Sequence, residues 1–252
     1  MRGLAFALTL PLAFAVSSMA RAESSPPKRK TDCRVGARVV KLATEDGISL
    51  EAELHVPKAG SPVVVLFHMI PPSNDRKNYP PAFMEALLTR GWAVLNVDRR
   101  GAGRSGGVAR EAYRGPKGAL DVAAAVDFLG DHPCKFDLGR LTLVGASNGT
   151  TSILDYAQTH GARPPPSGLV FLTGGKYTEA QFSLQTERKS TPRVLFAWGQ
   201  REAPARKWAE AHKEGAPSGW AFQSYPSGAH GTRLLERLPA AIKGVVAWIH
   251  SR

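Results

Sequence analysis

The segment Leu141–Gly149 reads LTLVGASNG and decides the fold. Its first four residues favour a β-strand, the last five form a G-x-S-x-G pattern, and a helical pattern follows. This pattern between a strand and a helix is typical of a nucleophile elbow, a strained turn that projects a serine hydroxyl into a cleft. Glycine on both sides of the serine allows the strand and the helix to approach closely. The segment therefore predicts Ser147 as a nucleophile at the end of a strand.

Strands and helices alternate on both sides of this segment. Two β-rich runs flank Gly47 and predict a hairpin. Further predicted strands lie at 61–68, 92–98, 140–146, 168–174, 192–199 and 219–226. Helical patterns lie at 80–91, 117–133, 152–161, 202–215 and 234–252, the last with Pro239 near its middle. We therefore predict an α/β fold with a mostly parallel eight-stranded sheet and helices on both faces.

The Ser147 turn and this order of elements resemble the α/β-hydrolase superfamily over nearly all of residues 36–252. The resemblance implies an α/β-hydrolase fold and a serine hydrolase whose acid and histidine follow the serine along the chain. Many relatives insert a helical cap between the strands at 168–174 and 192–199. Only residues 175–191 intervene here, so we expect no sizeable cap domain.

His230 is the predicted general base, because a serine needs an oriented base to become a strong nucleophile. His160 ends a helical pattern, His212 lies within a charged one, and His250 lies two residues from the chain end. His230 instead lies in the small-residue loop 227–231, after the last predicted strand. The superfamily places its catalytic histidine there.

Glu202 is the predicted acid that orients His230. Relatives commonly carry aspartate three residues after a glycine such as Gly199, and glutamate occupies that place here. A carboxylate at this point would fix the tautomer of the imidazole and stabilise its charged form. Glu202 has an alternative role as an acidic residue at a helix N-terminus. Glu179, after the preceding strand, is the alternative acid.

The oxyanion hole is expected to use two backbone N–H groups. The first is that of Asn148, directly after the serine. The second should come from the loop after residues 61–68, where relatives usually read His-Gly and this chain reads HMIPP at 68–72. The two prolines have no N–H, which leaves Met69 or Ile70, and Ile70 is the expected donor. His68 is interpreted as a structural histidine.

A glycine-rich run at 101–106 fits the dinucleotide pattern G-x-G-x-x-G. Nucleotide binding would require a helix that opens at this run, whereas a loop continues, and Asp121 lies within a later helical pattern. The run at 98–105 instead resembles a structural loop of α/β-hydrolases. We therefore expect no nucleotide. No Cys/His cluster has zinc spacing. The serine-hydrolase chemistry predicted here implies no metal or organic cofactor.

Residues 1–22 have the features of a secretory signal peptide: Arg2, an apolar run, and an A-x-A site ending at Ala22. Residues 23–35 are interpreted as a polar N-terminal tether, and 36–252 as the hydrolase domain. We expect export to a periplasmic or extracellular location after cleavage near Ala22. No later segment is apolar and long enough to span a membrane, so the mature form should have no transmembrane segment.

The formal net charge of +12 comes from basic residues that are mostly scattered along the chain. No nucleic-acid-binding motif accompanies them, so we expect no nucleic-acid partner. Two cysteines, Cys33 and Cys134, make a disulfide plausible in an exported protein. Two separate thiols are the alternative.

These residues predict acyl transfer through a covalent intermediate on Ser147. The expected activity is carboxylic ester hydrolysis of small-molecule or acylated substrates. An amidase, peptidase or thioesterase would use the same triad, and a non-catalytic binding protein of the cell envelope is the alternative from another class. The sequence does not indicate an oligomeric state.

Overall fold

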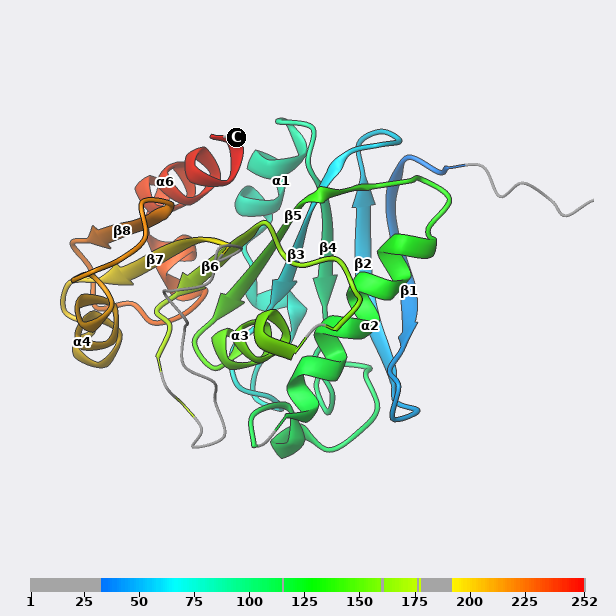
Figure 1. Ribbon diagram of the computed structural model, residues 1–252, viewed down its shortest axis with the longest axis horizontal. Helices are drawn as coiled ribbons and strands as arrows, with labels where there is room; N and C mark the ends of the chain where they lie inside the picture. The colour runs from blue at the N-terminus through cyan, green and yellow to red at the C-terminus, as the bar shows by residue number, and fades with distance from the viewer. Residues whose placement is uncertain (1–32, 115, 160, 176, 178–191, 252) are drawn as a thin grey trace, which may run out of the picture. The chain divides into compact units, whose positions relative to one another are not determined.

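The computed structural model describes residues 33–114, 116–159, 161–175, 177 and 192–251. Within these residues, eight strands form one sheet in the order β1-β2-β4-β3-β5-β6-β7-β8 (Figure 1). Strands β1 and β2 pair antiparallel, as do β2 and β4, and the remaining neighbours are parallel. The strands are β1 (Gly36–Ala43), β2 (Ser49–Val56), β3 (Pro62–Phe67), β4 (Ala93–Val97), β5 (Asp137–Ala146), β6 (Gly168–Leu172), β7 (Arg193–Gly199) and β8 (Trp220–Tyr225).

Helices cover both faces of this sheet. Buried residues of α2, α3 and α4 share one apolar cluster with the sheet, and those of α1, α5 and α6 share a second. The α-helices are α1 (Pro81–Leu88), α2 (Lys117–Asp131), α3 (Gly149–Thr159), α4 (Ala203–Ala211), α5 (Arg233–Arg237) and α6 (Pro239–His250). Short 3-10 helices lie at Arg76–Asn78 and Ala109–Ala112. The predicted α/β-hydrolase arrangement, with eight mostly parallel strands and helices on both faces, is confirmed.

Strand β3 shows why its apolar run is continuous. Val63, Val65 and Phe67 face the cluster that contains α2 and α3, whereas Val64 and Leu66 face the cluster that contains α1 and α6. Successive side chains of a strand point to opposite faces, so a strand covered by helices on both sides has no position left for a polar residue. Strand β3 pairs in parallel with β5, so the carboxyl ends of the two strands lie side by side, with Phe67 opposite Gly145.

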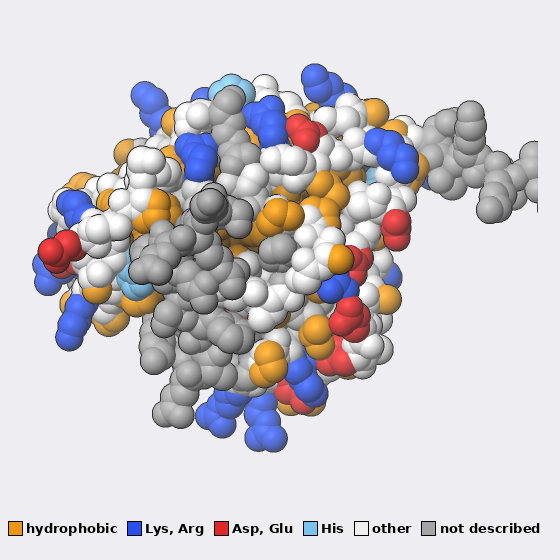
Figure 2. Space-filling model, in the orientation of Figure 1, with side chains coloured by type: hydrophobic (Ala, Val, Ile, Leu, Met, Phe, Trp, Pro, Cys, Tyr) orange, Lys and Arg blue, Asp and Glu red, His pale blue; other side chains and the backbone are white. Residues whose placement is uncertain are grey.

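The connection between β6 and β7 carries no helical cap in the residues that the structure describes. Residues 178–191 of this connection lie outside them. None of the described helices combines the length and the apolar character that crossing a bilayer requires. Figure 2 shows one face of the molecule, on which the lysine and arginine side chains of the described residues are scattered and separated by other side chains.

The helical pattern at 234–252 is wrong as one element, because two helices occupy this region. Helix α5 ends at Arg237 and α6 begins at Pro239, while Leu238 between them is extended with φ −132° and ψ 98°. Proline lacks the N–H that a continuous helix needs and disfavours helical geometry in the residue before it. Its fixed φ suits the first position of a helix, so Pro239 starts α6 rather than kinking a longer one.

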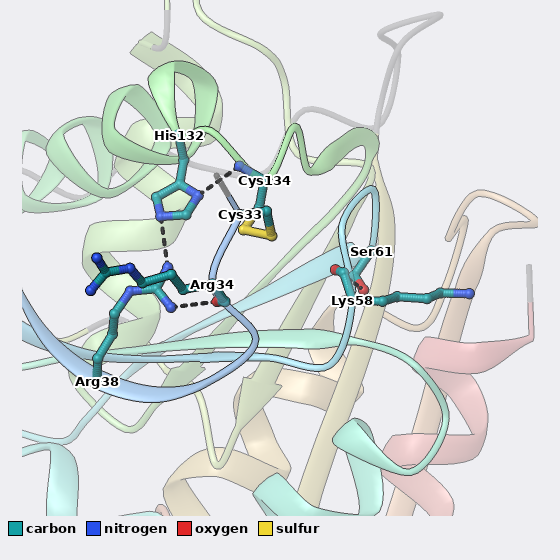
Figure 3. The surroundings of a disulfide bond; sticks show 7 residues. All are labelled: Cys33, Arg34, Arg38, Lys58, Ser61, His132 and Cys134. Carbon is teal, nitrogen blue, oxygen red and sulfur yellow. Dashed lines mark hydrogen bonds between the residues drawn. A yellow bond between two sulfur atoms is a disulfide. The ribbon is translucent and has the colours of Figure 1, made fainter. Parts of the chain in front are cut away.

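Cys33 and Cys134 form a disulfide, which confirms the predicted pairing over the two-thiol alternative (Figure 3). The bond joins the segment before β1 to the loop between α2 and β5. Next to it, Nδ1 of His132 accepts a hydrogen bond from the N–H of Cys134 at 3.1 Å. The Arg38 guanidinium lies 2.9 Å from the other ring nitrogen, and burial together with this cation lowers the pKa of His132.

The disulfide closes a loop with a sequence separation of 101 residues. Replacing both cysteines by serine should lower the free energy of unfolding by about 2–4 kcal/mol, because the unfolded chain regains conformational freedom. Urea unfolding of the two proteins without reductant measures the difference. Reductant should shift the midpoint of the wild type and leave that of the double variant unchanged. Equal midpoints, or free thiols in denatured unreduced wild type, would contradict the role of the bond.

Candidate active site

Ser147 lies in the tight turn between the end of β5 and the start of α3. Its backbone has φ +50°, a left-handed conformation that non-glycine residues seldom adopt. The two flanking glycines are required by close backbone contacts. A Cβ on Gly145 would lie 2.7 Å from backbone atoms of Gly149, and a Cβ on Gly149 would lie 2.4 Å from the carbonyl oxygen of Phe67. The strand-turn-helix geometry expected of the G-x-S-x-G segment is therefore present.

Three side chains from separate strand ends form a continuous hydrogen-bonded chain. The Oγ of Ser147 lies 2.6 Å from Nε2 of His230, and Nδ1 of His230 lies 3.0 Å from Oε1 of Glu202. Ser147 follows β5, Glu202 follows β7, and His230 follows β8. The carboxyl ends of parallel strands meet at one edge of the sheet, which brings together residues far apart in sequence.

Glu202 makes the contacts of both roles that its sequence context suggested, beside His230 and at the start of α4. One carboxylate oxygen faces His230, while the other accepts a hydrogen bond from the N–H of Ala205 at 2.8 Å and so caps α4. The cap satisfies a backbone donor that the first turn of a helix would otherwise leave unpaired. It also restrains the carboxylate from behind, so the two roles support each other. Glu179, the alternative acid, lies outside the described residues.

The backbone segments expected to form an oxyanion hole flank Ser147. Among the described residues, no acceptor receives a hydrogen bond from the N–H of Asn148, Met69 or Ile70. Gly149 packs against the carbonyl oxygens of Phe67 and His68, which brings the elbow next to the 68–70 loop. Within the described part of the chain, the N–H groups of Asn148 and of this loop are therefore not taken up by a protein acceptor, as donors of an oxyanion hole would need.

His68 is part of the structure beneath this loop. Its Nδ1 donates to the carbonyl of Met69 at 2.8 Å, and its Nε2 accepts from the N–H of Arg99 at 3.0 Å. Burial, followed by the charge of Arg99, lowers the pKa of His68 to about 3. The ring is therefore neutral, and both of its nitrogens are used within the protein.

Two further residues near the candidate triad, Thr173 and Tyr177, belong to none of the sequence motifs described above. Thr173 follows β6 with φ +49°, and its Oγ1 accepts from the N–H of Gly231 at 2.6 Å. The same oxygen lies 3.4 Å from Nδ1 of His230. The hydroxyl of Tyr177 donates to the carbonyl of Thr173 at 2.7 Å and also contacts Ser147, and burial raises the pKa of this phenol to about 12. Both side chains reach the candidate triad only because the ends of separate strands lie side by side in the folded sheet.

The glycine-rich run at 101–106 forms a closed structural loop. A Cβ on Gly103 would lie 2.1 Å from the carboxylate of Asp98, so only glycine fits there. Arg100 is fully buried and pairs with the buried Asp121 at 2.7 Å. The next regular element is the short 3-10 helix Ala109–Ala112, not a helix that opens at the glycines. Within the described ranges, no group of three or more His, Cys, Asp or Glu residues is arranged to hold a metal ion.

The pKa of His68 predicts a pH-dependent contribution to stability. The unfolded chain binds a proton at His68 near pH 6.5, whereas the folded protein does so only near pH 3. Lowering the pH between these values therefore favours the unfolded state, by roughly 1 kcal/mol per pH unit.

Urea unfolding of the wild type and His68→Asn between pH 7 and pH 4 measures this contribution. The asparagine variant should be less stable at pH 7 but should lose less stability as the pH falls. Identical pH slopes for the two proteins would show that His68 titrates normally in the folded state.

Comparison with known proteins agrees with this geometry. The family model described as X-Pro dipeptidyl-peptidase (S15 family) matches residues 46–165, which include Ser147. No curated protein matches the chain. Among solved structures, the Pyrococcus furiosus esterase Pf2001 is 20% identical, with a TM-score of 0.65 over 90% of this chain and 95% of that chain.

Two further solved structures have the same fold. Dienelactone hydrolase from Anabaena variabilis is 17% identical, with a TM-score of 0.60 over 85% of this chain and 95% of its own. The α/β-hydrolase GrgF from a Penicillium species is 12% identical, with a TM-score of 0.66 over 85% of this chain and 98% of its own. Together with the sheet order and the Ser147 elbow, these similarities show that the chain has the α/β-hydrolase fold.

Proposed function

We propose that this chain is a serine hydrolase that cleaves carboxylic esters through an acyl-enzyme on Ser147. The observation that carries the proposal is the unbroken hydrogen-bonded chain from Ser147 Oγ through His230 to Glu202, at 2.6 Å and 3.0 Å. Both distances suit proton transfer without rearrangement of the side chains. The strained backbone of Ser147 supports the same role, because such strain is retained mainly at functional sites.

The geometry accounts for each proton in the reaction. Nε2 of His230 takes the proton of Ser147 as Oγ attacks the ester carbonyl, and the resulting oxyanion accepts hydrogen bonds from the N–H groups of Asn148 and Ile70. His230 then gives that proton to the departing alkoxide, which leaves as an alcohol. A water molecule attacks the acyl-enzyme by the same route and releases the acid. Glu202 holds the ring with Nδ1 protonated and stabilises the imidazolium.

Ester bonds are the proposed substrates because the structural relatives named above include an esterase and a dienelactone hydrolase. The S15 match supports an amide or peptide substrate as the second candidate. That match ends at residue 165, before Glu202 and His230. A panel of p-nitrophenyl esters of graded chain length, aminoacyl amides and acyl-thioesters distinguishes the candidates by relative kcat/KM. A non-catalytic binding protein is disfavoured, because it would not need an aligned triad.

Export is part of the proposal. Residues 1–22 have the composition of a signal peptide, although they lie outside the described residues. The Cys33–Cys134 disulfide supports an oxidising compartment, such as a periplasm or the extracellular space. Mass spectrometry of the protein recovered from its host should find an N-terminus just after Ala22. An intact N-terminus on the mature protein would contradict this part of the proposal.

A fluorophosphonate probe tests Ser147 directly. The folded wild type should be labelled once, on Ser147, and Ser147→Ala should not be labelled. The same variant should lose ester hydrolysis by about 10⁴-fold or more, because no other group can form the acyl-enzyme. Thermal unfolding of both proteins controls for misfolding. Absence of labelling in a folded wild type would contradict the assignment of an active nucleophile.

The acid is tested by Glu202→Gln. Glutamine can still accept from the N–H of Ala205, so α4 keeps its cap and stability should change little. Its amide cannot hold His230 in the required tautomer, and kcat/KM should fall by about 10²- to 10⁴-fold. Glu179→Gln is the matched control and should leave activity unchanged. Full activity in Glu202→Gln with loss in Glu179→Gln would assign the acid to Glu179 instead.

A further inference from the structure

Arg99 carries a fully buried guanidinium that hydrogen-bonds to neutral acceptors. Its Nη1 lies 2.9 Å from Oδ1 of Asn148 and 3.3 Å from the carbonyl oxygens of both His68 and Met69. Its Nη2 donates to the carbonyl of Ala112 and to the hydroxyl of Ser152. Among the ion pairs of the described residues, none involves Arg99, whereas the adjacent Arg100 pairs with Asp121.

The charge of the nearby Asp121 offsets part of the cost of burying Arg99, but Asp121 pairs directly with Arg100 and not with Arg99. A buried cation without a direct ion pair is still costly, so its retention requires a reason. Burial lowers the pKa of Arg99 to about 10, which still leaves it protonated at neutral pH. An apolar side chain of similar volume would avoid the cost of desolvating the charge. The contacts of Nη1 suggest what the charge contributes, because they join the elbow to the 68–70 loop.

The contacts to His68 and Met69 determine where the neighbouring N–H groups point. A peptide unit is planar, and in the trans form its C=O and N–H point in opposite directions. The bonds after His68 and after Met69 are both trans. Since both carbonyls are directed at Arg99, the N–H of Met69 and that of Ile70 are directed away from it. The guanidinium thereby orients two peptide dipoles with their positive ends on the other side of the loop.

The 68–70 loop lies beside the segment that carries His230. The Met69 side chain packs against Gly231, where a Cβ would lie 2.2 Å from the Met69 sulfur. Gly231 directly follows His230 in the chain. Arg99 also holds the side chain of Asn148, whose own N–H remains without a protein acceptor in the described part of the chain.

We propose that Arg99 is the positioning residue of the oxyanion hole: one guanidinium orients the peptides of the 68–70 loop and anchors Asn148 beside Ser147. The proposal rests on the acyl-transfer function proposed above. This role explains how the 68–70 loop can supply an N–H donor without the glycine that relatives carry there. Arg99 fixes the carbonyl groups of His68 and Met69, so the loop does not need the backbone freedom of glycine. The buried positive charge also favours the negative oxygen that forms in the transition state.

The test compares Arg99→Met and Arg99→Lys with wild type. Both variants should lower kcat about 10- to 100-fold and change KM less than about threefold, because the oriented N–H groups act mainly on the transition state. Lysine keeps the charge but has no planar fork, so it should restore only part of the activity. Affinity for a trifluoromethyl ketone, which forms an oxyanion on Ser147, should fall in parallel with kcat/KM. Affinity for an unreactive ether analogue of the substrate should not fall.

Val126→Ala is the matched control for lost stability. Val126 is a buried residue of α2 and belongs to the apolar core, so this variant should unfold more easily but keep its kcat and its ketone affinity. If Arg99→Met fails to fold, Asn148→Ala replaces it in the comparison beside Arg99→Lys. The Asn148→Ala substitution removes one acceptor of Arg99 Nη1 but leaves the backbone N–H in place, and kcat should fall several-fold.

Two outcomes overturn the proposal and are distinguishable. Folded Arg99 variants with wild-type kcat and ketone affinity, in an enzyme that hydrolyses esters and reacts with fluorophosphonate, overturn this inference alone. A folded wild type that neither hydrolyses esters nor reacts with fluorophosphonate overturns the proposed function together with it. Equal loss of ester turnover in Val126→Ala and in the Arg99 variants also overturns the positioning role, because stability would then account for the effect.

Discussion

The backbone of Gly149 runs directly against the carbonyl oxygens of Phe67 and His68, with no room for a side chain between them. This approach brings the end of β3, the end of β5 and the start of α3 to one point at the edge of the sheet. Ser147 is forced into a left-handed conformation there, and the loop after β3 lies beside it. The remaining features of the candidate site are built around this contact, because any larger residue would separate Ser147 from the loop.

Polar groups buried beneath that contact keep it in one arrangement. His68 is neutral and bonded through both nitrogens, and Arg99 is charged and bonded to carbonyl, amide and hydroxyl oxygens. The Nε of Arg99 is buried without a hydrogen-bond partner among the described residues, whereas both of its Nη atoms are bonded. The hydrogen bonds that are made resist rearrangement, because each broken one would leave a further unpaired group in a medium without water. Elsewhere in the site, Thr173 accepts a hydrogen bond from the residue after His230, and the cap of α4 restrains the carboxylate of Glu202. The candidate triad is therefore held by contacts with neighbouring segments as well as by its own hydrogen bonds.

Much of the fold could be predicted because several independent sequence patterns indicate the same architecture. The apolar runs of the strands, the helical spacing between them and the G-x-S-x-G turn all indicate the same architecture, and the sheet order follows it. The order of serine, acid and histidine gave residues that the structure brings within hydrogen-bond distance. The break at Leu238 was missed, although Pro239 marks it, because the apolar spacing continues across the break while the backbone does not.

The sequence by itself determined which residues are available for the proposed acyl transfer, because motif spacing and the succession of strands and helices along the chain are local properties. Only the tertiary structure decided how they are oriented. It showed that Glu202 faces His230 and caps α4 at once, and that Arg99 contacts the elbow and the 68–70 loop together. These contacts join segments far apart along the chain, and a side chain's direction depends on which strands become neighbours in the sheet. No local pattern indicates that pairing, so the proposed role of Arg99 rests on the carbonyl groups that surround it.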